Sequence, residues 1–200
     1  HQMIEAGEIP SVPIYVDSPL AINASQIFNE HPECMDAETL ADIRTRGHAA
    51  LDFKQITYTR SVAESKAINE YNKPAIIISA SGMAEAGRIL HHLRNNIQDP
   101  RNTILIVGWQ APHTLGRRLA ERETQVRIFG ETFNRKAKVE TIGGLSAHAG
   151  REMLIEYASA VKDQVKQVFL VHGEERGALP LKKELEMQGF QDVFFPEAQS

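Results

Sequence analysis

The sequence predicts an α/β fold in which a mostly parallel sheet is flanked by helices. Two continuous apolar segments, Pro74–Ser79 and Thr103–Gly108, have the pattern of parallel strands that are buried on both faces. Ser61 and Glu64 have the spacing of a capping box, which marks the start of a helix. Strand-like and helix-like segments alternate along the chain, and this alternation is typical of a parallel sheet covered by helices.

The remaining elements follow from apolar periodicity and from turn residues. Ser18-Pro19 has the pattern of a helix start, because serine caps a helix and proline suits its first position. The predicted strands are 13–17, 54–59, 74–79, 103–108, 125–129, 137–142, 167–171 and 192–195. The predicted helices are 19–30, 36–50, 61–71, 83–96, 114–122, 150–161 and 175–188. Two adjacent strand-like stretches within 123–141 interrupt the alternation, so we expect one domain over 1–122 and another over 123–200.

Composition excludes several classes of protein. The chain has 200 residues, of which 42% are hydrophobic and 24% charged, as in ordinary globular proteins. A net charge of −4 argues against a strongly basic protein that coats nucleic acid. No apolar run reaches the roughly 18 residues of a membrane span, so no membrane is expected as a partner. Cys34 is the only cysteine, which excludes an intrachain disulfide and fits a cytoplasmic location. Because the first residue is His1, we expect the chain to begin inside a longer protein.

A basic strip runs from Arg117 to Lys138, with seven basic residues against three acidic ones. Such a strip on an acidic protein can guide a polyanion into one groove. The alternative is an ordinary solvated helix and loop face. Arg117 and Arg118 lie at its start and are candidate phosphate-binding residues, together with Arg88.

The segment Ser79-Ala80-Ser81-Gly82-Met83 lies between a predicted strand and a predicted helix. Small residues let a ligand approach the backbone, and the free N–H groups of a helix start attract anions, so Ser79, Ser81 and Gly82 are candidate phosphate-binding residues. The alternative is a tight turn capped by Ser81.

In a second loop between a predicted strand and a predicted helix, Trp109 either stacks on a base or belongs to the core. His91 and His92 are adjacent on one predicted helix, which makes them poor partners for one metal ion, and we expect surface and partial core positions for them.

Two histidines near the end of the chain are the strongest candidates for chemistry. They lie in Gly144-Leu145-Ser146-Ala147-His148-Ala149-Gly150 and in Val168-Phe169-Leu170-Val171-His172-Gly173-Glu174. Each lies between a predicted strand and a predicted helix, where sites collect in open parallel sheets. Histidine serves either as a proton donor near neutral pH or as a metal ligand. Because sites form beyond the carboxyl ends of parallel strands, we expect the strand ends that carry His148, His172 and the Ser79–Met83 loop to converge on one side of the molecule.

These segments resemble the β-CASP group of metallo-β-lactamase nucleases. The histidine loops are similar to its motifs B and C, and three further blocks match in the same order: 15–21, 79–88 and 114–118. Within this group, the chain resembles bacterial proteins that are similar to the endonuclease subunit of the pre-mRNA cleavage and polyadenylation factor. The resemblance assigns 1–122 to the β-CASP domain and 123–200 to the C-terminal portion of the metallo-β-lactamase αββα fold.

The resemblance implies a zinc-dependent ribonuclease that hydrolyses RNA phosphodiester bonds in RNA processing or decay. His148 is then the proton donor, and His172 is a ligand in a site for two Zn²⁺ ions. The family's His-x-His-x-Asp-His cluster does not occur in this chain. We therefore expect the chain alone to be inactive and to hold zinc weakly, since a catalytic zinc takes three protein ligands.

Two other interpretations remain. The chain could be a non-catalytic β-CASP module that binds RNA or a protein, or an unrelated nucleotide-binding α/β domain, which the lack of a glycine fingerprint disfavours. An exposed strand edge and apolar face after residue 123 further predict either a homodimer or a mobile end of the chain.

Overall fold

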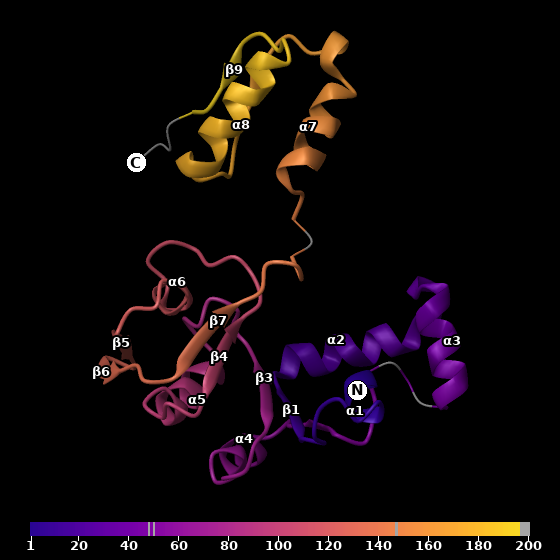
Figure 1. The fold of residues 1–200 in the computed structure, drawn as a ribbon, viewed down its shortest axis with the longest axis vertical. Helices are drawn as coiled ribbons and strands as arrows, with labels where there is room; N and C mark the ends of the chain where they lie inside the picture. Colours follow the sequence, from indigo (N-terminus) through magenta and orange to yellow (C-terminus); the bar gives the residue numbers. More distant parts are fainter. Residues whose placement is uncertain (48, 50, 147, 197–200) are drawn as a thin grey trace. The chain divides into compact units, whose positions relative to one another are not determined.

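The computed structural model describes residues 1–47, 49, 51–146 and 148–196. The chain divides into two compact units, His1–Ser146 and Ala147–Ser200 (Figure 1). The helices of the first unit are α1 (Gln2–Glu5), α2 (Pro19–Glu30), η1 (Pro32–Cys34), α3 (Ala37–Arg46), α4 (Val62–Ile68), α5 (Ile89–Asn96) and α6 (Leu115–Ala120). Its strands are β1 (Ile14–Asp17), β2 (Ile56–Tyr58), β3 (Ile76–Ser79), β4 (Thr103–Ile106), β5 (Gln125–Ile128), β6 (Glu131–Asn134) and β7 (Lys138–Thr141). The second unit contains α7 (Arg151–Ser159), η2 (Lys162–Gln164), β8 (Val168–Phe169), α8 (Glu175–Met187) and β9 (Val193–Phe194).

Parallel pairing dominates the described strands. In the first unit, β1 lies between β2 and β3, and all three run parallel. The register places Asp17 opposite Ser79, at the carboxyl end of the sheet. β4 and β7 form a second parallel pair, whereas β5 and β6 form an antiparallel hairpin. The predicted α/β class, with parallel strands and flanking helices, is confirmed.

Helix starts that depend on local chemistry lie where the sequence predicts them. The Ser18 hydroxyl accepts a hydrogen bond from the Ala21 N–H, and Pro19 is the first residue of α2. The predicted capping box at Ser61 and Glu64 is formed at the start of α4. α3 ends at Arg46, and the predicted end of this helix at Ala50 lies outside the described residues.

The main core of the first unit joins α5 and α6 to the later strands, and both helices lie next to the β4–β7 pair (Figure 1). Its buried members are Ala84, Leu93, Ile97, Ile106, Leu115, Leu119, Val126, Ile128 and Val139. Side chains from β5 and β7 therefore pack with the elements that precede residue 122. The expected domain boundary near residue 123 stays a prediction, and the compact first unit extends beyond it to Ser146.

One expectation about the strands is wrong, and one strand was missed. β3 and β4 are not buried on both faces, because Ile78 and Leu105 are each about half exposed. In β4, Ile104 and Ile106 pack in the main core, whereas the alternate side chains of the strand remain on the surface. The strand β6 was not predicted. It follows a two-residue turn at Phe129 and Gly130, both with positive φ, which is the geometry of a tight hairpin.

The second unit has its own small core of Leu185, Phe190 and Val193. The strands β8 and β9 run parallel, as predicted for this end of the chain. The stacked rings of Phe169 and Phe194 are exposed on these two strands. Across the described ranges of both units, no helix combines the length and the apolar character needed to cross a membrane.

Candidate RNA-binding loops and histidine sites

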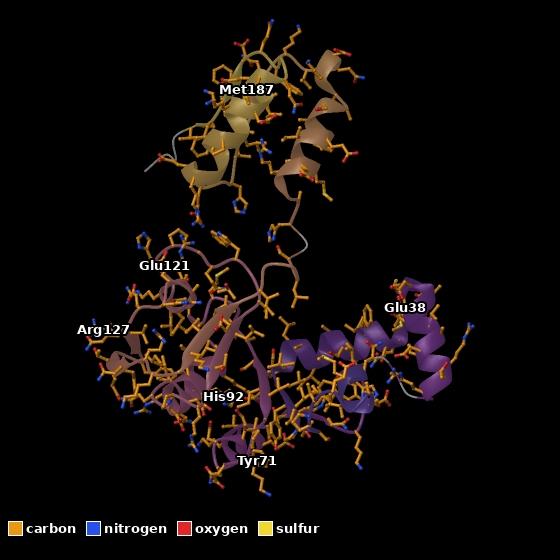
Figure 2. The ribbon with its side chains drawn as sticks, in the orientation of Figure 1. Glu38, Tyr71, His92, Glu121, Arg127 and Met187 are labelled. Atoms are coloured by element: carbon orange, nitrogen blue, oxygen red, sulfur yellow. The ribbon has the colours of Figure 1, made fainter. Side chains whose placement is uncertain are left out.

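Asp17 at the end of β1 is the centre of a buried polar network. Its side chain is fully buried, and its carboxylate accepts four side-chain hydrogen bonds. The donors are Thr59 Oγ1 at 2.5 Å, Ser65 Oγ at 2.6 Å, Arg88 Nη1 at 2.7 Å and His92 Nε2 at 2.7 Å. Figure 2 shows His92 inside the first unit, whereas Glu121 and Arg127 lie at its periphery.

The network holds the Asp17 carboxylate in its ionised form. Burial by itself raises the pKa of Asp17, but the four hydrogen bonds outweigh burial and lower the pKa to about 2 from the ordinary value of 3.8. Ion pairs at this depth are retained only when the remaining donors and acceptors are satisfied as well. The stability of the buried Asp17 carboxylate therefore depends on all four donors together.

The lowered pKa predicts a stability loss in acid. A carboxyl whose pKa is lower in the folded state stabilises the fold above its unfolded pKa, and this contribution is lost as pH falls through the folded pKa. A shift from 3.8 to about 2 corresponds to about 2 kcal/mol. Between pH 5 and pH 2, the free energy of unfolding of the wild-type chain should therefore fall by about 2 kcal/mol more than that of Asp17→Asn. Urea unfolding at several pH values measures this free energy. An equal pH dependence for the wild type and Asp17→Asn would contradict the lowered pKa of Asp17.

The loop from Ala80 to Arg88 is closed on itself by backbone contacts. The Ser81 N–H donates to the Ala86 carbonyl at 3.0 Å, and the Ile89 N–H donates to the Ala80 carbonyl at 3.1 Å. Gly87 has a φ of +83°, and a Cβ there would lie 2.5 Å from the Ala80 carbonyl oxygen. Only glycine fits this close approach.

This loop corrects the predicted start of α5. The helix begins at Ile89 rather than at Met83, so Ser79, Ser81 and Gly82 do not lie at a helix start. Ser81 does not cap the helix either, since its hydroxyl accepts from the Ala86 N–H within the loop. The expectation that the N–H groups of a helix start attract an anion here is therefore wrong, whereas phosphate binding at the small residues of the loop stays a prediction. The Ser79 hydroxyl donates to the Asp17 carbonyl at 3.0 Å, while Gly82 is exposed.

A second loop, 107–114, packs against the first. The Gly116 N–H donates to the Met83 carbonyl at 2.9 Å, and the Ala111 N–H lies 3.3 Å from the Met83 sulfur. The Glu85 carboxylate accepts from the Leu115 N–H. Trp109 is 52% exposed on this loop, so the interpretation of it as a core residue is wrong. The two loops thus form one surface that carries an exposed indole.

The three candidate arginines differ in their surroundings. Besides Asp17, the Arg88 guanidinium donates to the carbonyls of Thr59 and Arg60, at 3.0 and 2.8 Å. Arg117 Nε donates to Glu121 at 2.6 Å, and its Nη1 donates to the Gln110 carbonyl at 3.1 Å. Arg118 is half-buried, and no ion pair joins its side chain to any residue in the described part of the chain.

The two C-terminal histidines lie in the loops that the sequence predicts. His148 is exposed between β7 and α7, and His172 is exposed between β8 and α8. His172 has a φ of 64°, a left-handed conformation that is uncommon outside glycine, asparagine, aspartate and histidine. The expectation that their strand ends converge with the Ser79–Met83 loop on one side of the molecule stays a prediction, because that loop belongs to the other unit.

The metal donors within the described residues do not by themselves fit a zinc site. In these ranges, no group of three or more histidine, cysteine, aspartate or glutamate side chains has the arrangement of a metal site. A catalytic zinc takes three protein ligands, and His172 alone supplies one. Weak zinc binding by the chain alone stays a prediction.

Sequence reasoning missed the polar network. Asp17, Thr59, Ser65 and His92 were not among the predicted site residues, and His92 is almost fully buried. Two signals were present in the sequence. A lone carboxylate ends a buried strand, and Arg88 and His92 have the spacing of one helix face.

Comparison with known proteins identifies the first part of the chain. A family model described as the Beta-Casp domain matches residues 1–119. The chain belongs to the Beta-Casp family. A second model, the Zn-dependent metallo-hydrolase RNA specificity domain, matches residues 132–196. Membership of the β-CASP group of metallo-β-lactamase RNA nucleases is thereby confirmed.

Several proteins that are similar to this chain are longer. Ribonuclease TTHA0252 of Thermus thermophilus is 35% identical over 181 residues, which cover 90% of this chain and 41% of that protein. Transcription termination factor FttA of Methanosarcina mazei is 28% identical over 185 residues, 90% of this chain and 29% of that protein. FttA of Thermococcus kodakarensis is 31% identical over 182 residues, 87% of this chain and 28% of that protein. The chain therefore spans less than half the length of these Beta-Casp relatives.

Proposed function

We propose that the full-length Beta-Casp protein is a zinc-dependent ribonuclease that hydrolyses RNA phosphodiester bonds in RNA processing or decay. One observation carries the proposal: a Beta-Casp match over 1–119 is followed in the same chain by a match to a Zn-dependent metallo-hydrolase RNA specificity domain. A relative named as a ribonuclease supports the same chemistry.

His148 and His172 have different proposed roles. His148 donates a proton to the oxygen that leaves when the phosphodiester bond breaks, because an imidazole serves as a general acid near neutral pH. His172 supplies one ligand to a site for two zinc ions, which residues outside this chain complete. Their exposure in loops that follow strands supports both roles, since each imidazole is accessible to a large substrate.

RNA is proposed to contact the surface formed by the two packed loops of the first unit. Ser81 and Gly82 let a phosphate approach the backbone, and the exposed Trp109 ring can stack on a base. Among the predicted cations, Arg118 is favoured as the phosphate contact. The guanidinium groups of Arg88 and Arg117 already bond to groups within the protein.

Removal of the Arg118 charge is expected to change the salt dependence of RNA binding. Each phosphate contact contributes about 0.7 to the slope of log affinity against log salt for a single strand. Fluorescence anisotropy with a labelled single-stranded RNA should therefore give Arg118→Gln a slope smaller by about 0.7. Arg101→Gln is the control, because Arg101 is highly exposed and its ion pair is with the nearby Asp99. Equal slopes for wild type and Arg118→Gln would show that Arg118 is merely solvated.

A cytoplasmic homodimer is also proposed. The exposed rings of Phe169 and Phe194 lie side by side on β8 and β9, and apolar surface of this kind favours association. Sedimentation velocity of the chain should show a dimer that Phe169→Lys dissociates, and a monomer at all concentrations would refute the dimer.

The proposed cytoplasmic location has its own test. The protein should be recovered in the soluble cytoplasmic fraction of its host.

A further inference from the structure

The Ala80–Arg88 loop is fixed at both ends to the same residue. At its start, Ser79 pairs with Asp17 in the β1–β3 register, and the Ser79 hydroxyl donates to the Asp17 carbonyl. At its end, Arg88 donates to the Asp17 carboxylate at 2.7 Å. One turn further along α5, His92 donates to the second oxygen of the same carboxylate.

The neighbouring elements hold Asp17 in turn. Thr59 follows β2 and Ser65 lies in α4, and both hydroxyls donate to the carboxylate. Two further N–H groups of the Arg88 guanidinium donate to the Thr59 and Arg60 carbonyls. With its side chain about four-fifths buried, the Arg88 fork faces the protein interior.

We propose that Asp17, Arg88 and His92 are positioning residues that set the conformation of the Ala80–Arg88 loop for RNA binding. Arg88 acts through Asp17 rather than as a phosphate contact, because three of its five N–H donors bond to protein oxygens and its side chain is largely buried. This inference rests on the proposed function, since it assigns the loop to the RNA-binding surface.

Replacement of Arg88 by lysine separates the two possible roles of this residue. A lysine keeps the positive charge, so a phosphate contact would largely survive. A lysine cannot supply the planar fork that reaches Asp17 and two carbonyls at once. Arg88→Lys should therefore weaken binding of a labelled single-stranded RNA about tenfold, as expected if the loop adopts the competent conformation about a tenth of the time. The slope of log affinity against log salt should remain that of the wild type.

Hydrogen exchange gives a readout that does not depend on RNA. In Arg88→Lys and Asp17→Asn, the amides of Ser81 and Ile89 should exchange faster than in the wild type, whereas those of β4 should not change. If Asp17→Asn does not fold, Ser65→Ala is the milder variant, since it removes one of the four hydrogen bonds to the carboxylate. Arg101→Gln is the control for removal of a distant charge.

The outcomes are distinct. Weaker RNA binding at an unchanged slope, with faster exchange confined to the loop, supports the positioning role. Wild-type affinity in Arg88→Lys, or wild-type exchange of the loop in all the variants, overturns it. If the wild-type chain binds no RNA, the proposed function fails, and the exchange of the loop still decides whether Asp17 and Arg88 position it.

Discussion

Replacement of His148 by alanine is expected to lower RNA hydrolysis by the full-length protein about 10²–10⁴-fold while its zinc content stays unchanged. The leaving oxygen of a phosphodiester develops negative charge as the bond breaks, and a proton from a nearby imidazole neutralises it. Alanine removes that proton donor but no metal ligand. Single-turnover cleavage of a labelled RNA measures the rate, and elemental analysis of the same preparation measures zinc.

His31→Ala is the matched control for this variant. His31 is also exposed, but it lies beside η1, where it contacts Glu33, and it belongs to none of the candidate loops. Its replacement should leave both the rate and the zinc content unchanged. A His148→Ala variant that cleaves RNA at the wild-type rate, or one that loses its zinc, would contradict the role of a proton donor.

Replacement of His172 is expected to lower zinc occupancy together with activity. Loss of one ligand weakens metal binding directly, because the ligands that remain cannot hold the ion as tightly. Elemental analysis after dialysis should show less zinc in His172→Ala than in His148→Ala, with a rate at least as low. Full zinc occupancy in both variants would refute the assignment of His172 as a ligand.

The left-handed backbone at His172 calls for a second variant. Alanine is strained at the φ of 64° found here, so that a loss of activity could reflect the loop rather than the ligand. Asparagine tolerates this conformation better, and its neutral amide is a poor zinc ligand. His172→Asn should therefore lose zinc as His172→Ala does. If His172→Asn retains zinc while His172→Ala does not, the backbone rather than the imidazole is responsible.

Local chemistry explains why much of the fold was predictable. The capping box at Ser61 and the Ser18-Pro19 pair each act within one turn of a helix, and both helices begin where they predict. The loops of His148 and His172 were likewise placed correctly, because the strand and the helix around each have clear patterns.

The errors come from contacts that a local pattern does not contain. The segment from Met83 to Arg88 has helical residues, but Gly87 and the contact between Ala80 and Ile89 close it into a loop. Apolar composition predicted that Ile78 and Leu105 would be buried, yet no neighbouring element within the described residues covers them. The four partners of Asp17 are 42, 48, 71 and 75 residues away along the chain, so only the fold brings them together.

The most direct test of the central claim is cleavage of a labelled single-stranded RNA by the zinc-loaded full-length protein. The account predicts shortened products that disappear on chelation, return when zinc is restored, and form far more slowly with His148→Ala. The 200-residue chain alone, under the same conditions, should bind the RNA and leave it intact. Zinc-loaded wild-type protein that binds the RNA without cutting it would contradict a ribonuclease and indicate a non-catalytic RNA-binding module instead.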